Sequence, residues 1–310
     1  MDLRETLPII LLAGPTAVGK TALSLELAHR LDTEIVNADS MQIYRYMDIG
    51  TAKPTPEERA LAPHHLLDVV DPDEPFDAAR YLDLAKPVVD ALHAKGKIPL
   101  VVGGTGLYMK ILTRGICPAA PGDPAVREEL QADEERRGLP AMHAELVSSD
   151  PQLGARLHPN DRQRILRALE VFRITGIPLS QWQEQHRFQQ TVYPSIKVFL
   201  YRDRSELYQR IDRRVLQMME AGFLEEVQGL MARGYGPELK PMQSLGYKQM
   251  VRHLLGKCTH GEAVQEMQRE TRRYAKRQMT WFRGDPDFRW FDVSCGKEIL
   301  AWVKSSANMP

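Results

Sequence analysis

The amino-acid sequence predicts an α/β fold in which a parallel sheet forms the core and a helical insertion interrupts it. Residues 8–13 and 98–102 are short, continuous apolar segments, which are typical of strands buried on both faces. Strand-like and helix-like segments alternate in the first part of the chain, and this alternation indicates a parallel sheet. Residues 117–194 have helix-like patterns without a convincing buried strand, which indicates the insertion.

The expected elements of the core follow one another in order. The strand at 8–13 precedes a helix at 21–31, where leucine and alanine recur at helical spacing, and a second strand is expected at 34–39. The further core elements expected are a strand at 65–70, a helix at 83–94, a strand at 98–102, a helix from about 107, a strand at 196–201 and one long helix from 205 to about 233.

The insertion is expected to be helical throughout. It opens with a segment rich in proline, glycine and alanine at 118–124, which is typical of a hinge. Helices are expected at 128–137, 161–175 and 179–187. Because domains average ~150 residues, the chain length suggests about two domains. We therefore expect a core formed by residues 1–117 and 196–310, and a helical insertion domain at 118–195.

Charge and composition exclude several classes of protein. Lysine and arginine together number 41, as do aspartate and glutamate, so bulk charge alone does not bind the chain to nucleic acid or membrane. Hydrophobic residues make up 43% and charged residues 26%, which is typical of globular chains and excludes wholesale disorder. The longest apolar segments fall far short of the ~20 residues of a membrane-spanning helix, so no membrane partner is expected.

The N-terminus and the cysteines favour a cytoplasmic location. The leading residues Asp2, Arg4 and Glu5 sum to a negative charge, whereas a secretory leader begins with positive charge. The three cysteines lie far apart, which excludes a cysteine-rich zinc site and makes a disulfide scaffold unfavourable.

A phosphate-binding loop follows the first strand. The segment GPTAVGKT fits G-x-x-x-x-G-K-[ST] in full, directly after a buried strand and at the start of a helix. Its residues are Gly14, Pro15, Thr16, Ala17, Val18, Gly19, Lys20 and Thr21. Backbone N–H groups and the helix N-terminus surround phosphate oxygens, while Lys20 adds a full positive charge and the Thr21 hydroxyl can hold Mg²⁺. The core is therefore predicted to be P-loop NTPase-like and to bind a di- or triphosphate with Mg²⁺.

Asp39 ends the second strand and begins the segment Asp39-Ser40-Met41-Gln42. In an open parallel sheet, ligands lie outside the carboxyl ends of the strands, so Asp39 is expected beside the phosphate loop. From the residues alone it is a general base, a Mg²⁺ ligand through water, or a structural cap.

A second glycine-rich turn follows the strand at 98–102. The strand continues into the segment GGTGLY at 103–108, where a P-loop NTPase carries an acidic metal ligand. This difference weakens an ATP-hydrolysing function. Thr105 presents a hydroxyl at the apex of the turn, where it either contacts a ligand or caps the following helix.

Five segments together resemble the bacterial tRNA dimethylallyltransferases, also called tRNA isopentenyltransferases. They are GPTAVGKT at 14–21, NADSMQIY at 37–44, GGTGLY at 103–108, NDRQRILRALE at 160–170 and SLGYKQ at 244–249. They occur in family order and span most of the chain. The resemblance implies transfer of a dimethylallyl group from dimethylallyl diphosphate to N6 of adenosine 37, next to the tRNA anticodon, with release of diphosphate. The phosphate loop would then hold a leaving group rather than a nucleotide.

The resemblance also implies roles for three catalytic residues. Asp39 would be the general base that accepts the proton of the adenine amine, Thr105 would contact substrate, and Arg214 would grip pyrophosphate. Lys20, the loop amides and Mg²⁺ would neutralise the charge that grows on pyrophosphate.

Two basic segments are candidates for RNA contact. Residues 161–173 contain four arginines, and residues 269–283 contain six basic side chains and one acid, Glu270. On a helix, Arg269, Arg272, Arg273, Lys276 and Arg277 share one face. This stripe is expected to lack the acidic partners of an ordinary solvated face.

The resemblance extends RNA contact to several other segments, including the insertion, which would reach the anticodon stem-loop. The residues implied to contact tRNA are Ser40, Met41, Gln42, Arg127, Gln163, Arg164, Ile165, Leu166, Arg167, Ser244, Leu245, Gly246, Tyr247, Lys248, Gln249, Arg272, Arg273, Lys276, Arg277 and Arg283.

Three alternatives share parts of this pattern. A nucleoside or nucleotide kinase would also combine a P-loop, a parallel sheet, a helical lid and phosphate-binding arginines. An adenylate isopentenyltransferase would use the same donor on a free nucleotide, but the insertion and the basic stripe favour a macromolecular acceptor. A non-catalytic RNA-binding protein on a P-loop scaffold is the third alternative. The enzyme is expected to act as a monomer.

Overall fold

The computed structural model describes residues 7–186 and 191–308, in two compact units. The core unit comprises Met1–Thr113 and Tyr193–Pro310, and the helical unit comprises Arg114–Val192. The expected boundaries of the insertion were 118 and 195. The charges near the N-terminus, and Arg187 at the expected end of the last insertion helix, lie outside the described residues.

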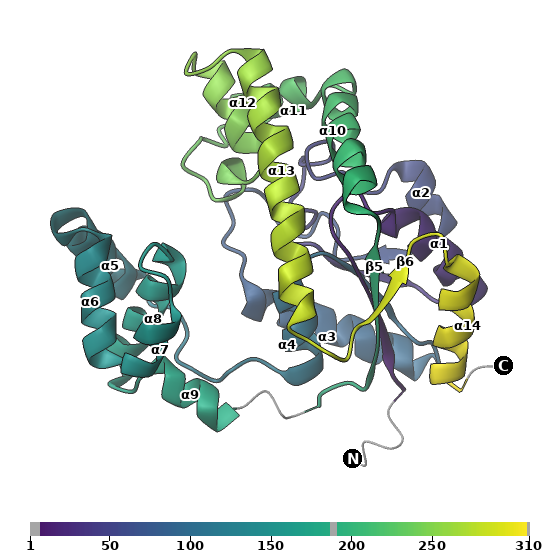
Figure 1. Ribbon diagram of the computed structural model, residues 1–310, viewed down its shortest axis with the longest axis horizontal. Coiled ribbons are helices and arrows are strands. Elements are labelled where there is room, and N and C mark those ends of the chain that lie inside the picture. The colour runs from purple at the N-terminus through teal and green to yellow at the C-terminus, as the bar shows by residue number, and fades with distance from the viewer. Residues whose placement is uncertain (1–6, 187–190, 309–310) are drawn as a thin grey trace. The chain divides into compact units, whose positions relative to one another are not determined.

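A sheet of six parallel strands forms the centre of the core unit (Figure 1), as the sequence predicted. The strands are β1 (Ile9–Ala13), β2 (Ile35–Ala38), β3 (His64–His65), β4 (Leu100–Gly103), β5 (Ser195–Tyr201) and β6 (Arg289–Asp292). Their order is β3-β2-β4-β1-β5-β6. The fully buried β1 pairs with β4 on one side and β5 on the other, so the strand order reverses there and a ligand site is expected at its carboxyl end.

Helices of the core unit cover both faces of this sheet. They are α1 (Lys20–Arg30), α2 (Pro56–Leu61), α3 (Ala78–Ala94), α4 (Gly106–Arg114), α10 (Arg204–Glu220), α11 (Phe223–Ala232), α12 (Tyr247–Leu254), α13 (His260–Arg283) and α14 (Gly296–Ser306), with a 3₁₀ turn at Pro241–Gln243. The long helix α13 packs against β5, where the rings of Phe199 and Phe282 lie 5.0 Å apart. This packing brings a distant part of the sequence to the centre of the sheet.

Two expected core elements differ in the structure. The strand expected at 65–70 is reduced to β3, because Leu66 and Asp68 have φ values of 62° and 56°, which extended backbone cannot adopt. The single helix expected from 205 to 233 is two helices, α10 and α11, because Gly222 between them has a φ of 93°. Both β6 and α14 follow the last element that the sequence pattern indicated.

The helical unit is built from five helices: α5 (Pro124–Arg137), α6 (Leu139–Ser149), α7 (Pro151–Arg156), α8 (Arg162–Thr175) and α9 (Leu179–His186). Its small core contains Leu130, Met142, Leu146 and Ile165. Two of these helices, α6 and α7, were not expected from the sequence. Among the described residues of both units, none of the helices combines the length and apolar character needed to cross a membrane.

Candidate active site

The phosphate loop joins β1 to α1 in the conformation that its sequence predicts. Ala17 and Gly19 have φ values of 65° and 112°, which turn the backbone tightly before α1 begins at Lys20. A Cβ atom on Gly14 would lie 3.0 Å from the Leu200 carbonyl oxygen, so a side chain here would require β5 to shift slightly. Val18 is fully buried and anchors the loop in the core. The N–H groups at the start of α1 can therefore bind an anion.

Lys20 carries the full positive charge of this loop. Its Nζ donates hydrogen bonds to the carbonyl oxygens of Gly14 and Pro15, at 2.9 and 3.0 Å. The Lys20 pKa is lowered to about 8, mainly by burial; the negative charge of Asp39 opposes the shift and the positive charge of Arg214 adds to it. A bound anion would compensate this cation and raise its pKa again.

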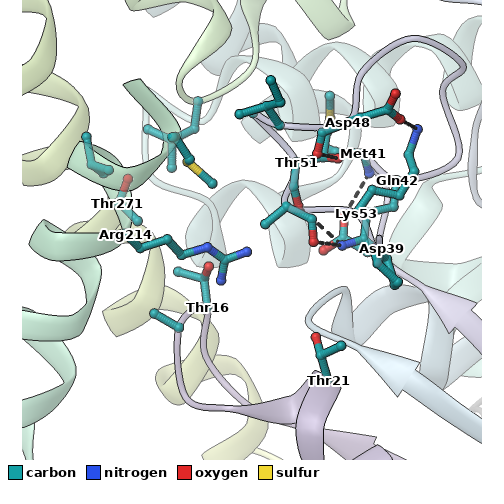
Figure 2. Close-up of a pocket in the computed structure, with 18 of the residues that line it drawn as sticks. Thr16, Thr21, Asp39, Met41, Gln42, Asp48, Thr51, Lys53, Arg214 and Thr271 are labelled. Carbon is teal, nitrogen blue, oxygen red and sulfur yellow. Dashed lines mark hydrogen bonds and ion pairs between the residues drawn. The ribbon is translucent and has the colours of Figure 1, made fainter. Parts of the chain in front are cut away.

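The phosphate loop opens into a cavity of about 1550 Å³ that lies within the core unit. Its walls come from the phosphate loop, the segment that follows β2, and helices α10 and α13. Figure 2 shows Arg214 reaching into this cavity near Thr16, with Asp39 on another wall and Thr21 at the base. The structure thus brings Arg214 to the same cavity as Thr16, Thr21 and Asp39, although almost two hundred residues separate it from them in the sequence.

Asp39 is held by its own loop. Its Oδ1 accepts a hydrogen bond from the Met41 backbone N–H at 2.8 Å, and its own N–H donates to Asn37 Oδ1 at 3.1 Å. The local turn fixes the carboxylate without an ion pair to a neighbouring side chain in the described part of the chain. Asp39 is therefore both a structural cap, as one hypothesis had it, and a carboxylate that faces the cavity.

Thr105 positions the loop that carries Asp39. Its hydroxyl accepts a hydrogen bond from the Ser40 N–H at 3.1 Å, and its N–H donates to the Ala38 carbonyl oxygen at 3.2 Å. A Cβ on Gly103 would lie 2.1 Å from that same carbonyl oxygen, which explains the glycine in this turn. Thr105 is not among the lining residues of the cavity, and its hydroxyl instead positions Ser40, which is.

Gln278 links the two glycine-rich turns, and the sequence analysis did not identify it. Its Oε1 accepts a hydrogen bond from the Thr16 N–H at 3.0 Å, and its Nε2 donates to the Gly104 carbonyl oxygen at 3.2 Å. Its side chain is 6% exposed and lies on the face of α13 that also buries Ala275 and Phe282. A glutamine on the apolar face of a helix was the available signal.

Arg214 is the second cation of the cavity. It projects from α10 and makes no ion pair with a carboxylate at salt-bridge distance among residues 7–186 and 191–308. Burial lowers its pKa, while the negative charge of Asp39 raises it and Arg210 lowers it. Arg210 lies four residues before Arg214 on α10. It contacts the phosphate loop, because its Nε donates to the Ala17 carbonyl oxygen at 3.0 Å. Two half-buried cations without a carboxylate at salt-bridge distance in the described residues are suited to a ligand with several negative charges.

A metal ion here would depend on the ligand for most of its contacts. Within the described ranges, the chain has no group of three or more His, Cys, Asp or Glu side chains that could hold a metal. Mg²⁺ typically keeps several waters and binds one or two protein oxygens together with substrate phosphates. The Thr21 hydroxyl at the start of α1, on the wall of the cavity, fits such a site.

The segment that follows Asp39 forms one wall of the cavity. Ser40, Met41 and Gln42 all line it, and Gln42 Nε2 donates to the carbonyl oxygens of Thr51 and Ala52 at 3.2 and 3.1 Å. The predicted tRNA-contacting residues of this segment therefore face the cavity together.

Glu226 holds the same wall from the other side, and the sequence analysis did not identify it either. Its carboxylate accepts hydrogen bonds from the N–H groups of Asp48, Ile49 and Gly50 at 2.9, 2.7 and 3.2 Å. It also accepts one from the Tyr247 hydroxyl at 2.6 Å. A carboxylate with four donors is a rigid support for the wall.

The predicted tRNA segment at 244–249 divides into exposed and buried positions. Ser244, Leu245 and Lys248 line the cavity and can contact a ligand. Tyr247 lines it too, although its side chain is almost fully buried, and Gln249 is fully buried. Gly246, with a φ of 91°, and Gln249 form the start of α12, so they position this segment from within.

The expectation that the α13 stripe lacks acidic partners is wrong. Arg272 forms an ion pair with Asp212 of α10, and Arg273 pairs with Glu270 at 2.8 Å. Arg269 also lies 3.5 Å from Glu270. Asp212 could not be identified as a partner from the sequence pattern, because it lies on another helix.

The other predicted tRNA contacts of α13 remain available. Lys276 and Arg277 are exposed and have no ion pair with a carboxylate in the described part of the chain, and Arg277 lines the cavity. Arg283 lies over the ring of Trp290, with its guanidinium carbon 5.6 Å from the centroid.

The arginines of the helical unit that were candidates for RNA contact have acidic partners. The pairs are Arg127–Glu170, Arg162–Glu134, Arg164–Asp161, Arg167–Glu170 and Arg173 with both Asp133 and Glu145. Ile165, which was predicted to contact tRNA, is 0% exposed and belongs to the core of the unit, whereas Gln163 is exposed and Leu166 is half-buried. The side chain of Ile165 therefore cannot touch RNA in this conformation.

Comparison with known proteins gives a consistent result. The profile of the family described as IPP transferase matches residues 42–285. The tRNA dimethylallyltransferase of Syntrophobacter fumaroxidans is 65% identical over 97% of this chain and 88% of its own length. The tRNA dimethylallyltransferase of Geobacter sulfurreducens is 51% identical over 95% of each chain.

Solved structures agree with this match. The tRNA isopentenylpyrophosphate transferase of Bacillus halodurans has a TM-score of 0.73 and is 39% identical, over 97% of both chains. A eukaryotic dimethylallyltransferase acting on tRNA has a TM-score of 0.80 and is 29% identical, over 97% of this chain and 80% of its own.

Proposed function

The chain belongs to the IPP transferase family, and from this premise we propose how its cavity carries out the reaction. The protein is a prenyltransferase that transfers a dimethylallyl group to an adenosine of tRNA. This activity sets aside the kinase, the free-nucleotide transferase and the non-catalytic alternatives. The donor in our proposal is dimethylallyl diphosphate, and the acceptor atom is N6 of adenosine 37 in the anticodon stem-loop.

One observation carries the proposal. Lys20, Arg214 and Asp39 face a single cavity within one compact unit, and the two cations lack a carboxylate at salt-bridge distance in the described residues. A diphosphate placed on the phosphate loop would compensate both cations. Asp39 would then lie on the wall where an acceptor amine enters.

The phosphate loop would bind the leaving group of the donor. The N–H groups at the start of α1 and the side chains of Lys20 and Thr16 would contact the diphosphate oxygens. The Thr21 hydroxyl, together with the diphosphate, would hold Mg²⁺, which would supply positive charge to the leaving pyrophosphate. Arg214 would approach from α10 on the opposite side. Each well-placed donor of this kind contributes about 3–4 kcal/mol to the transition state.

The transfer itself exchanges one bond for another. The allylic C1–O bond breaks and its electron pair leaves with pyrophosphate, while the N6 lone pair forms the new bond to C1. N6 then carries an extra proton, and the Asp39 carboxylate accepts it. Because the Met41 N–H already occupies Oδ1, the other oxygen, Oδ2, is the one that receives the proton.

The acceptor would enter along the wall formed by residues 40–51. Adenosine 37 must leave its stack to reach the cavity, at a cost of a few kcal/mol. Ser40, Met41 and Gln42 would contact the extruded base, and Lys276 and Arg277 would bind the phosphate backbone. The helical unit would contact the anticodon stem-loop through exposed groups such as Gln163.

Lys20, Asp39 and Arg214, the groups that the proposed reaction uses, all belong to one compact unit, so we propose that a monomer suffices. The three cysteines are free thiols, which suits the cytoplasm, where we expect the enzyme to meet tRNA.

Replacing Asp39 tests the assignment of the base. Asp39→Asn should lower turnover by ~10²–10⁴-fold, because the amide cannot accept the proton. Its Oδ1 can still accept from Met41, so tRNA binding should stay near the wild-type value. The assay uses radiolabelled dimethylallyl diphosphate, unmodified tRNA and Mg²⁺, with a free adenosine nucleotide as the competing acceptor.

Two results would contradict the proposal. Turnover of Asp39→Asn within a factor of ten of wild type would remove Asp39 as the base. Equal transfer to the free nucleotide would remove tRNA as the preferred acceptor.

A further inference from the structure

Tyr46 has a backbone conformation that its side chain disfavours. Its φ is 67°, in the left-handed region that bulky residues rarely adopt. It lies in the wall that follows Asp39 and lines the cavity. Such an outlier persists only where the surrounding structure holds it, and outliers of this kind cluster at functional sites.

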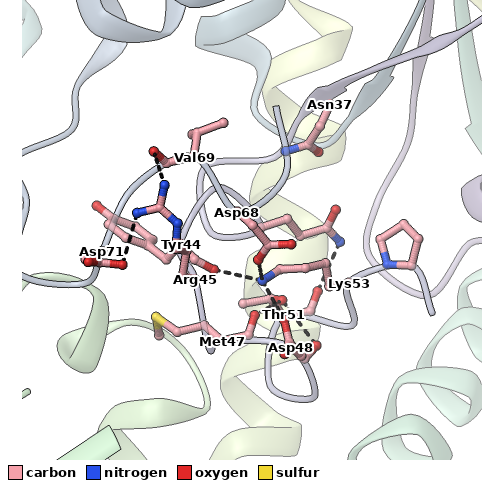
Figure 3. A network of polar contacts seen from close by, with 12 residues as sticks. Asn37, Tyr44, Arg45, Met47, Asp48, Thr51, Lys53, Asp68, Val69 and Asp71 are labelled. Carbon is pink, nitrogen blue, oxygen red and sulfur yellow. Dashed lines mark hydrogen bonds and ion pairs between the residues drawn. The ribbon is translucent and has the colours of Figure 1, made fainter. Parts of the chain in front are cut away.

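The flanking residues hold this conformation from both sides. The Arg45 N–H donates to the Val70 carbonyl oxygen at 2.9 Å, and Met47 is fully buried. Lys53 Nζ donates to the Tyr44 carbonyl oxygen and to Asp48 Oδ1, at 2.7 and 2.6 Å (Figure 3).

Glu226 adds the backbone hydrogen bonds at Asp48 and Ile49. The segment around Tyr46 is therefore fixed at positive φ, and Tyr46 keeps its place in the cavity lining.

The ring of Tyr46 is exposed and already part of an aromatic stack. It is 41% exposed, and the Tyr235 ring lies 6.3 Å away at an interplanar angle of 23°. The Arg233 guanidinium lies 4.4 Å from the Tyr46 centroid. A ring that is partly exposed, with a guanidinium over it, in the lining of a ligand cavity is suited to another planar π-system on its remaining surface.

We propose that Tyr46, with Tyr235 and Arg233, forms a platform on which one base of the tRNA anticodon loop stacks. This inference rests on the proposed function, because it takes tRNA as the macromolecule that enters the cavity. Bases splayed from RNA loops are recognised by stacking on aromatic rings and guanidinium planes. The occupant is a base that neighbours the target adenosine, since Tyr46 and Asp39 lie in the same wall.

The surroundings favour a base over a phosphate or a prenyl tail. Arg45 beside Tyr46 is paired with Asp71 at 3.1 Å and lies 3.9 Å from Glu74, so the charge of Arg45 is not free for phosphate, while the guanidinium of Arg233 lies over the ring itself. The cavity of about 1550 Å³ exceeds the ~300–1,000 Å³ of ordinary small-molecule sites, so it has room beyond the donor and one nucleoside.

The strained backbone permits an unusual test. Tyr46→Gly removes the ring and also relieves the positive φ, so the fold should not lose stability through strain. Tyr46→Phe keeps the ring. Tyr201→Ala removes a tyrosine of similar exposure, 39%, that does not line the cavity. Binding of unmodified anticodon stem-loop RNA, the KM for dimethylallyl diphosphate and the thermal midpoint are measured for each variant.

The platform predicts a specific combination of results. Tyr46→Gly should weaken RNA binding roughly 5- to 100-fold with an unchanged KM for the donor, and Tyr46→Phe should stay within about 3-fold. With 2-aminopurine next to the target adenosine, the fluorescence quenching caused by stacking should be lost in Tyr46→Gly alone. Tyr201→Ala should match wild type in binding.

Two outcomes would overturn the platform. RNA binding by Tyr46→Gly within twofold of wild type would reduce the stack to a local packing contact. A raised donor KM with unchanged RNA binding would assign the ring to the prenyl tail. Wild-type transfer to tRNA, measured in the same experiment, reports on the proposed function separately from either outcome.

Discussion

The cations of the cavity and the arginines of the helical unit differ in what they face. Lys20 and Arg214 lie at the cavity without a carboxylate at salt-bridge distance in the described residues, and burial lowers the pKa of both. The candidate RNA-contacting arginines of the helical unit face acids instead, as in the Arg162–Glu134 pair at 2.6 Å and the Arg127–Glu170 pair at 2.7 Å. The first arrangement leaves positive charge for a ligand, and the second uses that charge within the unit.

A cluster of basic residues in a sequence therefore does not by itself indicate an RNA surface. The four arginines at 161–173 and the stripe on α13 look alike in sequence, but some of their acidic partners, such as Asp133 for Arg173 and Asp212 for Arg272, are far away along the chain. On α13 only part of the stripe is neutralised, because Arg272 and Arg273 are paired whereas Lys276 and Arg277 are not paired with carboxylates in the described residues. The next three experiments test this distinction.

Removing the unpaired cation of the cavity should have the largest effect. Arg214→Gln should lower kcat/KM by ~10²–10³-fold, because one donor to the developing pyrophosphate is lost. Steady-state kinetics at varied dimethylallyl diphosphate measure it. Arg204→Gln, on the same helix but outside the cavity lining, is the control and should behave as wild type. Equal effects of the two substitutions would mean that Arg214 acts only through the general charge of the helix.

An intermediate effect is expected on α13. The double substitution Lys276→Ala and Arg277→Ala should reduce the slope of log Kd for tRNA against log salt by about 2, one for each lost phosphate contact. Arg272→Ala should change this slope much less and should instead lower the thermal midpoint, because Asp212 loses its partner. If Arg272→Ala flattened the slope as much as the double substitution, Arg272 would contact RNA phosphate despite its ion pair with Asp212.

The smallest effect is expected in the helical unit. Arg173→Met removes a guanidinium that bridges Asp133 and Glu145 at 2.8 and 3.0 Å. Urea denaturation should show a loss of about 1 kcal/mol, since exposed ion pairs contribute ~0.2–1 kcal/mol each and both acids keep another arginine. Affinity for tRNA should stay within twofold. A fall in affinity without loss of stability would place Arg173 against RNA.

Local features of the fold were predictable because they depend on neighbours in sequence. The phosphate loop needs a buried strand, closely spaced glycines and a helix start, and all of these lie between residues 9 and 30. The division of residues 205–233 at Gly222 was also present as a local signal, since glycine readily adopts positive φ, but the surrounding helical pattern obscured it.

The supports of the site were not predictable in the same way. Gln278 reaches Thr16 from 262 positions away, and Glu226 reaches Asp48 from 178 positions away. Both are ordinary polar residues of amphipathic helices when only the sequence is considered. Their roles depend on which backbone N–H groups the fold leaves without a partner.

The sequence by itself determined the parallel α/β core, the phosphate loop, the candidate base and the family, because each depends on residues that are contiguous or on motifs in a fixed order. Only the tertiary structure decided which positive charges remain available to a ligand and how Thr105 and Gln278 hold the loops. It also decided that Tyr46 is held at positive φ in the cavity lining. Hydrogen bonds and ion pairs act over a few ångströms in space, and chain folding alone determines which distant residues come that close.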